Sequence, residues 1–226
     1  MDQQTEISTT EFFLIKHRFY STVIADILKA IQGGSYGGAF VLTFCCIDYM
    51  SFAMQPNKEK NTSGDFKAFI RKYLVPINEK YLEYESQLYA FRCSLVHTYG
   101  QSDATKKLNI TPQFSYNISP FEGHFIQAEK KLTLNLSNFV SEIICSVELY
   151  FKENENNIDN LRVWAGKLYY PQGLGELLER KLILEKNTIN YANIHPYLAT
   201  FDKEISLKDS CVRLKKEIET EMVNRL

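Results

Sequence analysis

One long apolar segment, residues 36–54 (YGGAFVLTFCCIDYMSFAM), constrains the fold of this chain more than any other feature. It carries a single charged residue, Asp48, and it approaches the length of a membrane-spanning helix. Asp48 lies inside the segment, however, and neither flank has the basic cluster or the aromatic belt that is typical of a membrane span. We therefore expect a core helix of a soluble helical bundle, surrounded by other helices, and no association with a membrane.

Apolar residues at three- and four-residue steps predict helices on both sides of this segment. The N-terminal helix follows from such a stripe between Phe12 and Ile31, with Ser8 and Glu11 as its capping box. A second stripe, from Leu136 to Tyr150, predicts another long helix. The fold class expected from these patterns is mainly α, an antiparallel up-and-down bundle.

Two further helices are expected between residues 65 and 100. Asp65 to Leu74 forms a short amphipathic pattern, and Pro76 follows it. A longer helix is expected from Asn78, with Gly100 at the position of a C-cap glycine.

The pattern changes between residues 105 and 135, where apolar and polar residues alternate. The segments 106–110, 113–119 and 124–134 are separated by proline and glycine, which predicts a small β-hairpin insertion or a three-stranded excursion. We expect residues 1–153 to form the bundle together with this insertion.

The charged, asparagine-rich segment KENENNIDN follows Phe151 and is interpreted as a break. Residues 154–226 are expected to form a C-terminal helical extension, with a short helix at 176–186 and a last helix capped by Ser206 and Asp209. The last helix carries an apolar stripe, so it should pack on the bundle or on a second subunit.

Charge and cysteine content limit the possible functions. The chain has 26 Lys and Arg against 27 Asp and Glu, which excludes a long basic surface for nucleic acid but not a small patch. Five cysteines without a CxxC pair, and an N-terminus without a secretory pattern, indicate reduced thiols in a cytoplasm. The four histidines lack metal-ligand spacing and no nucleotide-binding loop is present, so no metal and no cofactor is expected.

One motif with chemical potential lies at the end of the helix that starts at Asn78. The segment YAFRCSLVHTYG, residues 89–100, contains Arg92, His97 and Tyr99 in the spacing R-x4-H-x-Y. This motif resembles that of the HEPN domains, α-helical bundles whose ribonuclease members carry an Arg, four to six residues, and a His. In one subset, toxins that act beside a nucleotidyltransferase antitoxin, the motif extends to H-x-Y.

The resemblance implies a function and partners for this chain. It implies a metal-independent endoribonuclease of the toxin or defence type, a homodimer with the site at its interface, and Arg92 and His97 as catalytic residues. It further implies Tyr99 as an acceptor of AMP groups added by an antitoxin. Cys93 departs from the family, in which a polar residue usually follows the Arg, and Ser94 is a candidate for the missing polar group.

The residue types themselves suggest the chemistry. RNA brings its own nucleophile, the 2′-hydroxyl, while His97 can exchange protons near neutral pH and Arg92 can bind a phosphate. On a straight helix Arg92 and His97 lie about 140° apart, so we expect either local unwinding or a second subunit to complete the site. Asp48, an isolated acid in an apolar helix, is expected to pair with Arg92 or to orient His97.

Two other interpretations of the motif stay open. The chain could be a non-catalytic bundle that binds a nucleotide or a protein partner through Arg92 and His97. It could also be a structural homodimer in which both residues are buried away from any cleft.

Overall fold

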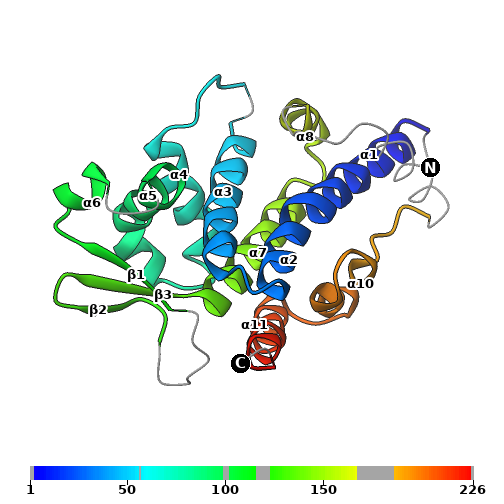
Figure 1. Ribbon diagram of the computed structural model, residues 1–226. Helices are drawn as coiled ribbons and strands as arrows, with labels where there is room; N and C mark the ends of the chain where they lie inside the picture. The colour runs from blue at the N-terminus through cyan, green and yellow to red at the C-terminus, as the bar shows by residue number, and fades with distance from the viewer. Residues whose placement is uncertain (1–2, 56, 99–101, 116–122, 167–185, 225–226) are drawn as a thin grey trace.

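Helices account for most of the chain, and the sheet is confined to residues 111–135. The computed structural model describes residues 3–55, 57–98, 102–115, 123–166 and 186–224. The protein is mainly helical with a small three-stranded sheet, as expected in outline (Figure 1).

The N-terminal helix runs almost without interruption from Gln3 to Gln32. It consists of α1 (Gln3–Phe19), a π-helical turn η1 (Tyr20–Ile24) and α2 (Ala25–Gln32), and it stops where Gly34 adopts a positive φ of 74°. The hydroxyl of Thr22 donates to the carbonyl of Arg18 at 2.8 Å, a bond that competes with the helical ladder where the π-turn begins. The predicted capping box at Ser8 is wrong, because the helix has already begun at Gln3.

The apolar segment forms α3 (Tyr36–Ala53), which lies in the middle of the molecule (Figure 1). On one side of it are α4 (Ser63–Phe69) and α5 (Lys80–Thr98), and on the other are α2 and α7 (Leu136–Glu153). Among the described residues it is the one helix long and apolar enough to cross a membrane, and half of it is buried inside the protein. Its buried side chains include Phe40, Phe44, Ile47 and Met50. In this structure α3 therefore serves as the central core helix.

Two helices complete the side of the bundle that faces Asp48. The first is α4 (Ser63–Phe69), which continues into a π-turn η2 (Ile70–Leu74), and the second is α5 (Lys80–Thr98). Thr62 and Asp65 form a reciprocal capping box that starts α4. The predicted C-cap at Gly100 lies outside the described residues.

The insertion contains three strands, which agrees with the second of the two alternatives expected for it. The strand expected at 106–110 is wrong, because residues 106 and 107 belong to a short helix, α6 (Asp103–Lys107), whose N-terminus Ser102 caps by accepting from the Thr105 N–H. The strands are β1 (Thr111–Ser115), β2 (Ile126–Ala128) and β3 (Lys131–Asn135), in the order β1-β3-β2. β3 pairs antiparallel with β2 but parallel with β1, so the sheet is more than a hairpin.

The chain after β3 returns to helices. These are α7 (Leu136–Glu153), α8 (Ile158–Ala165), α10 (Tyr191–Ile194), a 3₁₀ helix η3 (Pro196–Asp202) and α11 (Leu207–Val223). Ser206 caps α11 by accepting from the Asp209 N–H at 3.1 Å, which confirms that predicted helix start. The helix expected at 176–186 falls almost entirely outside the described residues, and Lys186 lies in a turn.

Apolar residues from the C-terminal part of the chain join the same core as those of the bundle. α11 packs along α7, and α8 packs against α1 and α3. Trp164 of α8 is completely buried, next to the rings of Phe19 and Phe151, and its indole N–H donates to the Tyr49 carbonyl at 3.1 Å. Residues 158–223, where described, are thus integrated with the bundle.

Candidate functional site

Asp48 and Arg92 form an ion pair between the two helices α3 and α5. Nε of Arg92 donates to Oδ2 of Asp48 at 2.6 Å, and each side chain is 22% exposed. A half-buried guanidinium needs such a partner, because an unpaired charge at a helix interface is costly. One of the two partnerships expected for Asp48 is therefore present.

His97 contacts the same guanidinium. Nη1 of Arg92 lies 2.9 Å from Nε2 of His97, and both residues belong to α5, which stays α-helical through Thr98. The local unwinding that we expected as one alternative is therefore absent, and completion of the site by a second subunit stays a prediction. The long arginine side chain extends along the helix surface and closes the gap that their angular separation leaves.

The contact assigns roles to the ring nitrogens of a neutral imidazole. A guanidinium only donates hydrogen bonds, so Nε2 of a neutral His97 accepts here and Nδ1 carries the ring proton. His97 is exposed, so its ring lies at the surface beside a cation. An imidazole with an accepting nitrogen can act as a general base.

For both Asp48 and Arg92, burial shifts the pKa in one direction and the neighbouring charges shift it in the other. Burial raises the pKa of Asp48, against the lowering effect of the hydrogen bond and charge of Arg92 and of the charge of His97. Burial disfavours the charge on Arg92, but the hydrogen bond and charge of Asp48 raise its pKa above the ordinary value. Arg92 therefore stays cationic.

The guanidinium keeps donors for a ligand. Among the described residues its hydrogen bonds go to Asp48 and His97. These two contacts use two of the five N–H groups of an arginine, which leaves donors that an anion can bind. Cys93, the next residue along the chain, is partly exposed.

A pocket of about 340 Å³ opens beside the pair. Its walls come from α3, α5, α8 and the loop before α4, and they are Cys45, Asp48, Tyr49, Phe52, Asn61, Arg92 and Trp164. The amide of Asn61 donates to the Asp48 carbonyl at 3.0 Å, and Tyr49 is 37% exposed. The pocket therefore combines a cation with aromatic walls, and His97 does not line it but contacts the Arg92 guanidinium.

Sequence reasoning missed most of these pocket residues. Tyr49 is the residue after Asp48 on the same helix, and Phe52 lies four residues after Asp48. This spacing could have identified both as neighbours of Asp48. Asn61 and Trp164 come from distant segments, and nothing in the sequence places them here.

Ser94, a further predicted site residue, does not lie beside Arg92. The Ser94 hydroxyl is buried and donates to the Ser102 hydroxyl at 2.9 Å, which ties α5 to the start of α6. The two positions Ser94 and Arg92 point to different sides of the helix. Tyr99 lies outside the described residues. The described residues also contain no group of three or more His, Cys, Asp or Glu that could hold a metal ion.

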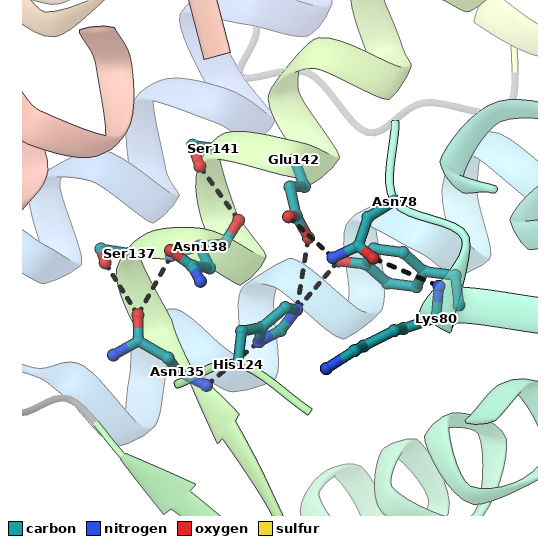
Figure 2. A network of polar contacts seen from close by, with 9 residues as sticks. Asn78, Lys80, His124, Asn135, Ser137, Asn138, Ser141 and Glu142 are labelled. Atoms are coloured by element: carbon teal, nitrogen blue, oxygen red, sulfur yellow. Dashed lines mark hydrogen bonds and ion pairs between the residues drawn. The ribbon is translucent and has the colours of Figure 1, made fainter. Parts of the chain in front are cut away.

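A second polar cluster surrounds His124, just before β2 (Figure 2). Its Nδ1 accepts from the Asn135 N–H at 3.2 Å, and its Nε2 lies 3.2 Å from Oε2 of Glu142 on α7. Tyr81 and Asn78 also contact this pair, Asn78 by donating to Glu142 at 3.1 Å.

The cluster is structural in character. Burial raises the pKa of Glu142, but hydrogen bonds from His124, Tyr81 and Asn78 outweigh it and hold that pKa below the ordinary value. Both nitrogens of His124 are used inside the protein, and its side chain is 3% exposed. His124 therefore fastens the sheet to α7 rather than facing a ligand.

Comparisons with family models, with curated proteins and with solved structures find no match to this chain.

Proposed function

We propose that this protein is a metal-independent endoribonuclease that uses Arg92 and His97. The observation that carries the proposal is the contact of 2.9 Å between Nη1 of Arg92 and an accepting Nε2 of His97, at the edge of a pocket. A phosphate-binding cation and an imidazole that can accept a proton are two groups that promote RNA cleavage by its own 2′-hydroxyl.

The mechanism follows from these groups. A phosphate of RNA takes N–H donors of Arg92 and leaves Nε2 of His97 to accept the proton of the adjacent 2′-hydroxyl. The 2′-oxygen attacks phosphorus, the bond to the 5′-oxygen breaks, and the leaving oxygen takes up a proton. Arg92 stabilises the charge that develops on the phosphoryl oxygens. The products are a 2′,3′-cyclic phosphate and a 5′-hydroxyl end.

The pocket supplies a place for the base next to that phosphate. Tyr49 and Phe52 offer aromatic faces, and base stacking on such faces is worth about 1–3 kcal/mol per base. A base can stack only when it is unpaired, so single-stranded RNA is the substrate class that fits best.

The proposal also covers the fold family, the cellular role and the assembly. The fold is a HEPN-like up-and-down bundle, and the role is that of a cytoplasmic toxin or defence protein. The assembly is a homodimer whose second Arg92 and His97 would supply the proton donor for the leaving oxygen. The proposal further includes a nucleotidyltransferase antitoxin that modifies Tyr99. The mainly helical fold and the position of Arg92 and His97 near the end of α5 support this picture.

A second candidate function is nucleotide binding without catalysis. It is favoured by the lining of the pocket, which contains Arg92 and aromatic side chains but not His97. In that case Arg92 and the aromatic walls would bind a nucleotide and His97 would not be needed for turnover.

Cleavage of matched oligonucleotides tests the proposal. The purified protein, with EDTA present, should cleave single-stranded RNA and leave the DNA of the same sequence intact. Arg92→Gln should abolish cleavage, whereas Arg71→Gln, which removes an exposed arginine that is also paired with a carboxylate, should not. Binding of RNA without cleavage would favour the second candidate.

A further inference from the structure

Two cysteines from distant parts of the chain meet where α11 packs on α7. The thiol of Cys145 lies 3.8 Å from the carbonyl oxygen of Leu207, the first residue of α11. In an α-helix that same carbonyl accepts the N–H of the residue four positions later, which is Cys211. The Cys145 sulfur is thus close to the backbone of Cys211, and both cysteines line one pocket.

The pair opens onto a pocket that is separate from the one at Arg92. This pocket has a volume of about 420 Å³ and is lined on its polar side by Ser141, Glu142 and Lys215 together with both cysteines. Cys211 is partly exposed, while Cys145 is buried behind it. A small reagent in the pocket would therefore reach Cys211 first.

The surroundings shift the pKa values of the two thiols in opposite directions. The hydrogen bond from Cys145 lowers the pKa of Cys211, with help from Ser141 and the charge of Lys215, against burial and the charge of Glu142. Burial raises the pKa of Cys145 well above its ordinary value. Cys211 is consequently the better thiolate, and Cys145 remains a thiol.

We propose that Cys211 and Cys145 form an oxidant-reactive dithiol, in which a hydroperoxide oxidises Cys211 and Cys145 resolves the product to a disulfide between α11 and α7. This inference is independent of the proposed ribonuclease activity.

The chemistry balances in two steps. The Cys211 thiolate attacks one peroxide oxygen, the O–O bond breaks, and the departing oxygen takes a proton to leave as water or an alcohol. The resulting sulfenic acid is attacked by the Cys145 sulfur, the S–O bond breaks, and a second water carries away the Cys145 proton. Two thiols lose two electrons and one peroxide is reduced.

Peptide mapping of the full-length protein tests this proposal. Fully reduced protein is treated with one equivalent of hydrogen peroxide, remaining thiols are blocked with N-ethylmaleimide, and the digest is analysed by mass spectrometry. The expected result is a cross-linked peptide pair that joins Cys145 to Cys211, with the other three cysteines alkylated. Unchanged alkylation of Cys145 and Cys211, or a disulfide between other cysteines, would overturn the proposal.

Variants separate the two roles. In Cys145→Ser, Cys211 should stop at the sulfenic acid and be trapped by dimedone, whereas in Cys211→Ser, Cys145 should stay reduced. Cys46→Ala, at a buried cysteine that does not line this pocket, should leave the yield of the disulfide unchanged. If a variant fails to fold, the peptide map of the wild-type protein still tests whether the disulfide forms, because that measurement requires no substitution. Dimedone labelling of Cys145 in place of Cys211 would also contradict the assignment.

Discussion

The carboxylate of Asp48 accepts a 2.6 Å hydrogen bond from Nε of Arg92, and this bond joins the central helix α3 to α5 at the edge of a pocket. It explains how an acid is retained in the most apolar helix of the chain. It also sets the direction of the guanidinium, whose Nη1 then reaches His97.

Asp48→Ala should destabilise the protein by about 1–2 kcal/mol, because it leaves the half-buried Arg92 without its carboxylate partner. This magnitude lies between those of exposed and of buried ion pairs. Urea unfolding of Asp48→Ala, Arg92→Ala and the double variant measures the coupling between the two residues. Additive losses would show that the pair contributes nothing to folding.

Stability should fall with acid because of His195. Its Nδ1 accepts from the Tyr197 N–H, and burial together with the charge of Lys29 lowers its pKa from 6.5 to about 4, against the charge of Glu221. The unfolded chain binds this proton near pH 6.5 and the folded protein only near pH 4. The stabilisation is therefore complete above pH 6.5 and declines as the pH falls toward 4, by about 3 kcal/mol in total.

Urea unfolding between pH 7.5 and about 4.5 checks this prediction. His195→Asn keeps an acceptor for the Tyr197 N–H but cannot titrate, so its stability should vary less over that range. An equally steep decline in the variant would assign the acid sensitivity to other groups.

His124→Ala should cost about 1–3 kcal/mol, because the Asn135 N–H and the Glu142 carboxylate would lose a buried partner. His97→Ala provides the matched control, since His97 is exposed and its loss should change stability by about 0.5 kcal/mol or less. Thermal or urea unfolding of both variants gives the comparison. Equal effects would contradict the structural role of His124.

Trp164→Ala should cost about 3–5 kcal/mol, since the indole is fully buried and donates to the Tyr49 carbonyl. The neighbouring Val163 is 43% exposed, so Val163→Ala should have little effect. A small loss for Trp164→Ala in urea unfolding would mean that α8 is not part of the folding unit.

The strongest periodic patterns of the sequence located the long helices. The segment that forms α3 and the Ser206 cap of α11 were predicted because each depends on local signals, namely an unbroken apolar run and a side chain that caps its own helix. The N-terminal start and the strand at 106–110 were predicted wrongly. Helix ends and short segments depend on weak local preferences that a single nearby cap, such as Ser102, can change.

The candidate site was predictable only in part. Asp48 and Arg92 were identified as candidate partners because charged side chains are rare on apolar helix faces. Their opposite charges suggested the ion pair that is present. The contact with His97 was missed because angular separation on a helix ignores the length of the arginine side chain. Trp164 and the pairing of Cys145 with Cys211 depend on how distant helices pack, which no local pattern records.

Cleavage of a single-stranded RNA by the wild-type protein and by His97→Gln, with EDTA present and the product ends identified, tests whether His97 acts in catalysis. The wild type should produce 2′,3′-cyclic phosphate ends, and His97→Gln, while still folded, should be slower by about 10²–10⁴-fold. Equal rates for the two proteins, or no cleavage by the folded wild type, would contradict this role of His97.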